Sequence, residues 1–238
     1  MNHIEVCFSP ALYADYENKE AIVVVTDILR ASSAIVTAFM NGVERLIPVG
    51  TLEEAKAYKN QGYMVAAERD GIVRDFADFG NSPYNFSADR VHGKEIVYST
   101  TNGTRAIHLA SSGHEVLIGA YLNLGALADY IRSCNRDLLI LCAGWKNKFN
   151  LEDTLFAGAL AGLVLADDRF TTICDSTHGA IDLYNLAKKD MMGYIEKVAQ
   201  RHRLKKNGLD DVIAYCHEID KTTMIPVFRK KSITLING

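Results

Sequence analysis

The chain has 238 residues, a formal net charge of −3 and 48% hydrophobic residues, which are ordinary values for a globular protein. The mild acidity and the absence of a basic stripe argue against nucleic acid as the main partner, and no apolar run reaches the about 18 residues that a membrane-spanning helix needs. The amino-terminal stretch has no signal-peptide pattern and the five cysteines are widely spaced, so we expect a cytoplasmic protein with free, mostly buried thiols.

The first part of the chain predicts two strands and a polar turn. Residues 3–8 alternate polar and apolar side chains, which predicts a half-exposed or edge strand, whereas the unbroken Ile and Val run 22–25 predicts a strand buried on both faces. Asp27 follows the second strand, and Arg30 precedes a helical pattern. Ligands of open α/β sheets bind outside the carboxyl ends of the strands, so this turn suggests a site for a cation together with an anion. A capping Asp and a solvated Arg are the alternative interpretation.

The next unit repeats the order of strand, acid and arginine. Thr51 with Glu54 three residues later is a capping box, which predicts a helix start. The strand after this helix ends directly before Glu68 and Arg69. Glu68 and Arg69 could supply a second carboxylate and a second guanidinium to a functional site. The alternative is an ordinary charged turn.

Residues 72–90 have little periodicity and contain a Gly-Asn-Ser-Pro turn that includes Asn81 and Ser82. A loop of this length is uncommon in a compact domain unless it is functional or partly structured.

A strand over residues 95–99 is followed by a polar turn and by a helix expected from about Ala106. Backbone N–H groups at a helix start and threonine hydroxyls can bind an anion, but an ordinary Ser/Thr-capped helix fits equally well. The polar residues of this turn are Thr100, Thr101, Asn102 and Thr104.

A third acidic turn comes after the apolar strand predicted over residues 138–143. Asn150 is placed to cap the long apolar helix that follows, which puts Glu152 and Asp153 in its first turn. Acids at this position also complement the helix dipole, which is the alternative to a functional role.

The carboxyl-terminal part predicts a strand over residues 171–174, mostly helical structure over 180–218 and one last strand within 224–236. The basic patch at residues 201–206 is interpreted as a solvated helix end.

Recurring strand, polar turn and helix units predict the α/β class, as a three-layer α/β/α architecture with a mostly parallel or mixed sheet. We expect a single α/β unit over residues 1–238, in which the polar turns converge on one edge of the sheet. Two similar α/β halves, with a subdivision near residues 110–135, are the alternative.

The polar turns supply carboxylates and guanidinium groups without a His/Cys cluster, which suits a hard cation, Mg²⁺ before Zn²⁺. A divalent ion and arginines are what metal-assisted attack of water on a phosphate ester needs. The dinucleotide-binding, Walker A and nucleophile-elbow motifs are absent from the sequence, and Leu29 stands where a haloacid-dehalogenase-type phosphatase would have its second Asp. The candidate catalytic residues are Asp27, Arg30 and Arg69, and the candidate metal ligands are Asp27, Glu68, Glu152 and Asp153. A nucleophile that accepts the phosphoryl group is the alternative role for Asp27.

Five motifs, which begin at Asp27, Glu68, Asp78, Thr100 and Cys142, have an order and spacing that resemble those of the 2-phosphosulfolactate phosphatases. The resemblance covers about residues 3–165 and extends more weakly to the end. It implies an Mg²⁺-dependent phosphatase that hydrolyses 2-phospho-3-sulfolactate to 3-sulfolactate and phosphate, a step toward coenzyme M. Residues 145–148 depart from the glycine-rich turn expected in the family, which affects the substrate-side contacts. The match implies substrate binding by Asn81, Ser82, Thr101, Asn102, Gly103 and Thr104.

The leading hypothesis is therefore a phosphatase acting on a small anionic phospho-acid, with Mg²⁺ as cofactor and neither nucleic acid nor membrane as partner; a homodimer is an open option. The alternatives are a phosphomonoesterase for another small phospho-acid and a non-catalytic protein that binds a small anion.

Overall fold

The computed structural model describes residues 1–236, so the last two residues of the unit expected over 1–238 lie outside the described residues. The strands are β1 (Asn2–Cys7), β2 (Ile22–Thr26), β3 (Arg45–Pro48), β4 (Met64–Arg69), β5 (Ile72–Val73), β6 (Glu95–Ser99), β7 (Glu115–Gly119), β8 (Leu138–Cys142), β9 (Phe170–Thr171), β10 (Pro226–Arg229) and β11 (Ser232–Leu235). The α-helices are α1 (Tyr13–Tyr16), α2 (Ala31–Met40), α3 (Leu52–Asn60), α4 (Ala88–Val91), α5 (Gly103–Leu109), α6 (Leu124–Cys134), α7 (Leu151–Val164), α8 (Asp175–Ala187), α9 (Met191–Tyr194), α10 (Ala199–Lys206) and α11 (Ile213–Cys216). Short 3₁₀ helices are η1 (Pro10–Leu12), η2 (Pro83–Asn85), η3 (Ala110–Ser112), η4 (Tyr121–Asn123) and η5 (Ile195–Lys197).

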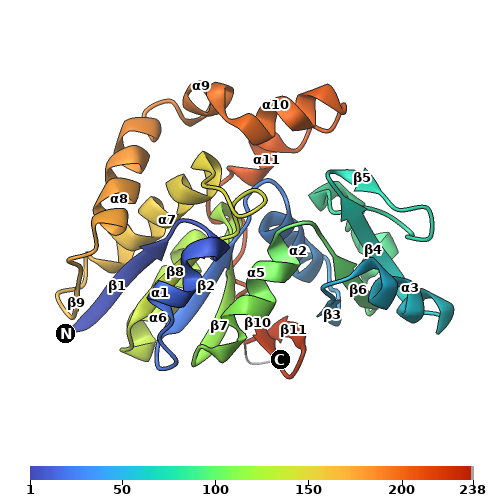
Figure 1. Cartoon of the computed structure of the whole chain (residues 1–238), viewed down its shortest axis with the longest axis horizontal. Coiled ribbons are helices and arrows are strands. Elements are labelled where there is room, and N and C mark those ends of the chain that lie inside the picture. Colours follow the sequence, from blue (N-terminus) through green and yellow to red (C-terminus); the bar gives the residue numbers. More distant parts are fainter. Residues whose placement is uncertain (237–238) are drawn as a thin grey trace.

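Within residues 1–236 these strands form one mixed sheet in the order β5-β4-β6-β3-β11-β10-β7-β2-β8-β1-β9 (Figure 1). Strands β7, β2, β8, β1 and β9 are mutually parallel, and so are β3, β6 and β4. The antiparallel hairpin of β10 and β11 joins the two parallel sets. The α/β class with a mixed sheet is thus confirmed, and the sheet itself is made of two parallel parts.

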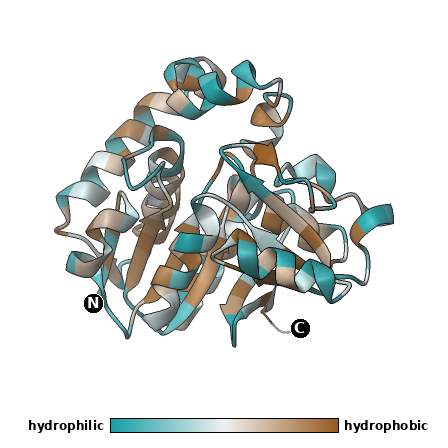
Figure 2. Cartoon of the chain, turned by 45° about the vertical axis from the view of Figure 1, so that its right-hand side comes forward, coloured by the Kyte–Doolittle hydropathy of each residue, from teal (hydrophilic) through white to brown (hydrophobic). Residues whose placement is uncertain are grey.

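The central strand β2 is buried on both faces, as its unbroken apolar run predicts. Ile22 and Val24 belong to one hydrophobic cluster, together with side chains of α6 and α7. Val23 and Val25 belong to a second cluster, with side chains of α2 and α5. Figure 2 shows that hydrophobic residues concentrate in the strands and that the outer segments are more hydrophilic. Helices therefore cover both faces of this part of the sheet, which gives the three predicted layers.

Three predicted elements differ from the structure. Helix α5 begins at Gly103 rather than near Ala106, because the polar turn already has helical geometry. Strand β9 has two residues instead of the four predicted over 171–174. The single strand predicted at the carboxyl end is the β10–β11 hairpin, whose turn residues Lys230 and Lys231 both have positive φ, 48° and 66°. Lysine is not typical of such a turn, so the sequence pattern did not indicate it.

The carboxyl-terminal helices extend across the top of the central strands. In Figure 1, α8 to α11 (orange to red) lead from the β1 side toward β5, above the ends of β2 and β8. Gln200 of α10 donates a hydrogen bond from Nε2 to the Leu29 carbonyl, 3.0 Å away, which ties this segment to the turn after β2.

Two further sequence predictions concern the whole chain. None of the helices described over residues 1–236 is both long and apolar enough to cross a membrane. The five cysteines are free thiols, and Cys7, Cys142 and Cys216 are buried.

Candidate active site

Asp27 lies in the turn between β2 and α2 and is partly buried. Its backbone N–H donates to Ser32 Oγ at 3.1 Å, and the Ser32 N–H donates to the Asp27 carbonyl at 2.9 Å. Loss of solvation and the nearby Asp153 and Glu68 carboxylates hold the pKa of Asp27 well above its ordinary value, while the Ala31 N–H acts in the opposite direction. In these surroundings the negative charge of Asp27 is unfavourable unless a nearby cation stabilises it or a proton neutralises it.

Asp153 connects three polypeptide segments from the first turn of α7, where it is fully buried. Its Oδ1 accepts the Ile28 N–H at 2.8 Å, and its Oδ2 accepts the Gly144 N–H at 3.2 Å. Asn150 Nδ2 donates to the same Oδ2 at 2.8 Å and to Glu152 Oε1 at 3.2 Å. Asn150 therefore occupies the predicted N-cap position, but its side chain binds the two acids instead of the helix backbone.

Glu152 is buried next to Asp153, with 2% of its surface exposed. Burial and then the Asp27 charge raise the pKa of Glu152 to about 7, and Arg203 acts in the opposite direction. Burial and the Glu152 charge likewise raise the pKa of Asp153 to about 8. These shifts agree in direction. Asn150 joins Glu152 to Asp153, and the hydrogen bond from the Ile28 N–H to Asp153 holds the turn that carries Asp27 next to them.

Glu68, at the end of β4, is also buried and joins two polar turns. Its Oε2 accepts the Gly71 N–H at 2.6 Å, and its Oε1 accepts the Thr101 N–H at 2.8 Å and the Thr101 hydroxyl at 3.2 Å. Glu68 thus holds the turn after β4 against the turn after β6.

Gly103 brings the start of α5 against the turn that carries Asp27. A Cβ atom on Gly103 would lie 2.6 Å from Ala31 Cβ and 3.1 Å from Asp27 Oδ2, so only glycine fits there. Asn102 Oδ1 accepts the Lys146 N–H at 3.1 Å, which adds the loop after β8. Within the same turn, the Thr104 N–H donates a hydrogen bond to Thr100 Oγ1 at 3.2 Å. The predicted convergence of these polar turns is therefore seen in their contacts.

Arg30 is a buried cation, with 4% of its surface exposed. Over the described residues 1–236, no hydrogen bond or ion pair joins its guanidinium to the rest of the protein. Its Nη2 lies 3.9 Å from the position that a Cβ would take on Gly71. A buried guanidinium without a protein partner is suited to bind an anion.

Arg69 lies elsewhere, although the sequence suggests the same role for it. Its guanidinium donates to the Glu68 carbonyl at 2.7 Å and to Ser99 Oγ at 3.0 Å. Arg69 lines a cavity of about 400 Å³ together with Arg105 and His108, and neither Asp27, Glu152 nor Asp153 is among the residues that line it. The structure thus directs Arg69 away from the three clustered carboxylates and partners it with protein acceptors.

Asn81 and Ser82 complete the set expected to bind substrate. Asn81 is buried, and its Oδ1 has no hydrogen-bond partner among residues 1–236. Ser82 precedes η2 without capping it through its side chain. No hydrogen bond in the described part of the chain connects either side chain to the clustered carboxylates.

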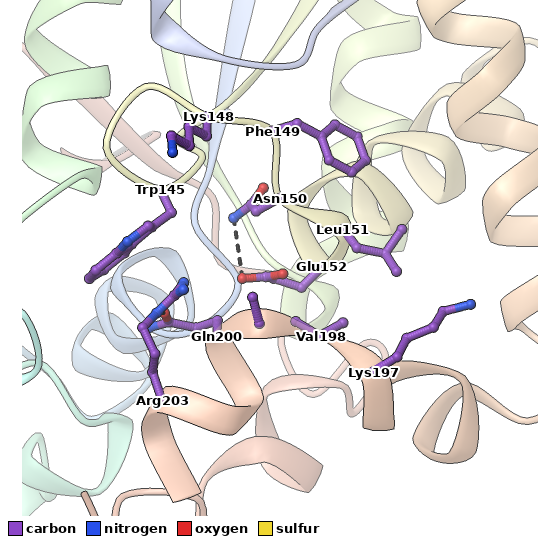
Figure 3. Close-up of a pocket in the computed structure, with 11 residues that line it drawn as sticks. Trp145, Lys148, Phe149, Asn150, Leu151, Glu152, Lys197, Val198, Gln200 and Arg203 are labelled. Carbon is purple, nitrogen blue, oxygen red and sulfur yellow. Dashed lines mark hydrogen bonds between the residues drawn. The ribbon is translucent and has the colours of Figure 1, made fainter. Parts of the chain in front are cut away.

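Sequence analysis missed Arg203, which belongs to the patch predicted to be a solvated helix end. Arg203 is partly buried and stacks on Trp145, with its guanidinium carbon 4.0 Å from the ring centre. Both residues line a cavity of about 290 Å³ that also includes Glu152 (Figure 3). One sequence feature could have indicated a site here: Trp145, the only tryptophan of the chain, is in a polar loop next to an acidic turn.

The carboxylates of the site do not form a preorganised metal-binding site made of protein ligands alone. Across residues 1–236, no three His, Cys, Asp or Glu side chains converge closely enough to hold one. Glu68 and Asp153 use both carboxylate oxygens for N–H donors, whereas only one Glu152 oxygen accepts a hydrogen bond. Asp27 and Glu152 are therefore the acids best able to accept a cation.

Comparisons with known proteins agree with the resemblance suggested by the motifs. A family model described as 2-phosphosulpholactate phosphatase matches residues 7–231. A probable 2-phosphosulfolactate phosphatase of Caldanaerobacter subterraneus subsp. tengcongensis is 35% identical over 216 residues, 89% of each chain. A protein of the same name from Clostridium novyi is 35% identical over 97% of this chain and 99% of its own length. One from Thermotoga maritima is 34% identical over 90% of this chain and 89% of its own.

Proposed function

The chain belongs to the 2-phosphosulpholactate phosphatase family, and from this premise we propose that it hydrolyses 2-phospho-3-sulfolactate to 3-sulfolactate and phosphate with Mg²⁺ as cofactor. In this reaction the oxygen of water forms a bond to phosphorus, the bond from phosphorus to the C2 oxygen breaks, and that oxygen takes a proton. The proposal includes a role for this step in coenzyme M synthesis.

The observation that carries the proposal is the buried Arg30 guanidinium, which has no protein partner within residues 1–236, in a site that also contains the acids Asp27 and Glu152. A phosphate ester brings negative charge, which Arg30 can bind because its guanidinium has no partner among residues 1–236. The acids would repel the same phosphate unless a cation stood between them. A site that holds buried charges of both signs therefore fits a phosphate ester together with a divalent cation.

The residues present fit Mg²⁺, which commonly binds to one or two carboxylates and completes its shell with water and substrate phosphate. Asp27 and Glu152 would hold it, and Glu68 and Asp153 would position the surrounding turns through the hydrogen bonds described above. When bound, Mg²⁺ would polarise the phosphate oxygens and neutralise part of their charge.

The remaining steps depend on the chain itself. Arg30 would hold the phosphoryl oxygens and stabilise the negative charge that develops on them in the transition state. Asp153 would keep the turn after β2 in place through Ile28, so that Asp27 and Arg30 face the same substrate.

Phosphate release from 2-phospho-3-sulfolactate, measured with Mg²⁺ and with EDTA, tests the proposal. We expect turnover with Mg²⁺ and loss of turnover with EDTA. Asp27→Asn keeps the size and one oxygen acceptor of the side chain but removes the charge that a hard cation needs, so we expect activity to fall by about 100-fold or more. Full turnover in EDTA would exclude the role of Mg²⁺, and an Asp27→Asn variant as active as the wild type would exclude the role of Asp27.

A further inference from the structure

A second anion-binding group lines the cavity next to the proposed reaction centre. The cavity of about 290 Å³ lies between the loop after β8, the start of α7 and the segment from η5 to α10. Figure 3 shows Arg203 and Trp145 on one side of it, with Glu152 and Asn150 close to them and Lys197 on another side. Lys148 and Lys197 also line it, and the Lys197 ammonium lies over the Tyr194 ring, 3.7 Å from its centre.

Arg203 is held in a fixed orientation. Its guanidinium carbon lies over the Trp145 ring, 4.0 Å from the ring centre, and its Nε donates to Gln200 Oε1 at 2.7 Å. Gln200 in turn donates to the Leu29 carbonyl at 3.0 Å. This chain of contacts connects Arg203 to the backbone of Leu29, the residue that precedes Arg30.

The outer edge of this guanidinium is free. In the part of the chain that the structure describes, Nη1 and Nη2 of Arg203 form no hydrogen bond and no ion pair. Stacking uses the face of the group and Gln200 uses Nε, which leaves the two terminal nitrogens to bind an oxyanion in a bidentate manner. Burial lowers the pKa of Arg203, whereas the charges of Glu152 and Asp70 act in the opposite direction.

We propose that Arg203, oriented by Trp145 and Gln200, binds the anionic group of the substrate that is not the phosphate. The inference rests on the proposed function and extends it to substrate choice: the preferred esters carry a sulfonate or carboxylate, which contacts Arg203 while the phosphate is held at Arg30. The cavity volume suits the remainder of a three-carbon acid.

The test compares 2-phospho-3-sulfolactate, which has further anionic groups, with p-nitrophenyl phosphate, which has none. Arg203→Lys keeps the charge but loses the planar fork and the stacking on Trp145. We expect KM for 2-phospho-3-sulfolactate to rise about tenfold or more with little change in kcat, and kcat/KM to fall at least about tenfold more for this ester than for p-nitrophenyl phosphate. Trp145→Ala should change the ratio in the same direction. With 2-phospholactate, which lacks the sulfonate, a smaller effect of Arg203→Lys assigns the contact to the sulfonate and an equal effect assigns it to the carboxylate.

Arg201→Lys is the matched control, because Arg201 is on the same helix and pairs with Glu196 outside the cavity. An equal effect of Arg203→Lys on both esters, or a ratio no different from that of the control, would overturn the inference. If the wild type hydrolyses no ester, the proposed function fails, and calorimetric titration with 3-sulfolactate then tests the anion site alone. Binding that weakens about tenfold in Arg203→Lys supports the site, and absence of binding to the wild type overturns it.

Discussion

Asp27 and Arg30 are three residues apart, and the turn between β2 and α2 places both in the site. They differ in the hydrogen bonds that hold them. The backbone N–H and carbonyl of Asp27 form hydrogen bonds with Ser32 in the first turn of α2, whereas the N-cap position of this helix is occupied by Arg30. The Arg30 guanidinium forms no hydrogen bond and no ion pair within residues 1–236, and it is buried nonetheless. Removing a guanidinium from water without a protein acceptor is costly, so its placement is better explained by a bound anion than by local structure.

Arg30→Lys and Arg69→Lys should therefore give different results. In Arg30→Lys the bidentate contact with phosphate is lost, and we expect kcat/KM to fall about tenfold or more, which corresponds to about 1.4 kcal/mol of transition-state stabilisation. In Arg69→Lys the hydrogen bonds to Glu68 and Ser99 are lost, so we expect a stability loss of about 1 kcal/mol and less than about a threefold change in kcat/KM. Steady-state kinetics and urea unfolding on both variants provide the comparison. Equal losses of kcat/KM would mean that Arg69 reaches the substrate after all, as its motif suggests.

The elements that meet at the site are short, and their ends pack closely. The start of α5 lies against the start of α2, and the contact depends on the missing side chain of Gly103. Asn102 and Lys146 then join the loop after β8 to the same place. Because the amino-terminal ends of two helices and two strand-end turns share this contact, a change in one element shifts the others.

Gly103→Ala tests this contact between elements. The added Cβ would overlap Ala31 Cβ and crowd Asp27 Oδ2, so we expect a loss of about 1–3 kcal/mol in unfolding free energy and a fall in kcat of about tenfold. Gly162→Ala is the matched control, because Gly162 lies in α7 with no atom within 4 Å of the added Cβ. That variant should gain about 0.5–1 kcal/mol from helix propensity and keep its activity. If both variants behave alike, the close approach at Gly103 does not position Asp27.

Across the whole molecule, local sequence patterns predicted most helices and strands. They did not predict the contacts between segments that are distant in the sequence. The capping box at Thr51 and Glu54 forms as expected, and the apolar run of β2 is buried on both faces. The β10–β11 hairpin joins two parallel sets that lie far away in sequence, and its Lys-Lys turn lacks the usual glycine or asparagine. Its position between β7 and β3 depends on side chains from both sets, which no local pattern encodes.

The candidate site shows the same limit. Two of the acidic turns were found because an acid directly after a buried strand is a local pattern, and the third because its acids follow a predicted N-cap. In the structure Asn150 joins Glu152 to Asp153, and the Asp27 charge acts on Glu152. Arg203 comes about fifty residues after Glu152 in a polar helix, within a run of basic residues from which no local pattern distinguishes it. Its stacking on Trp145 is a tertiary contact.

The clustered carboxylates also predict how the stability of the whole protein depends on pH and Mg²⁺. The pKa of Glu152 is about 7 in the folded protein and 4.5 ordinarily, so between these values the folded state binds more protons than the unfolded state. The unfolding free energy of the metal-free protein should therefore fall as pH rises through this window, by on the order of 3 kcal/mol from this group. Glu152→Gln removes the contribution of this group, so we expect a smaller slope in the profile measured by urea unfolding in EDTA between about pH 5 and about pH 8, while Asp27 and Asp153 still contribute to it. Mg²⁺ binds the folded state and replaces the protons, so it should restore the stability of the wild type at the upper pH and affect the variant much less. Parallel profiles of the two proteins in EDTA, or equal stabilisation of both by Mg²⁺, would contradict a shared carboxylate site at Glu152.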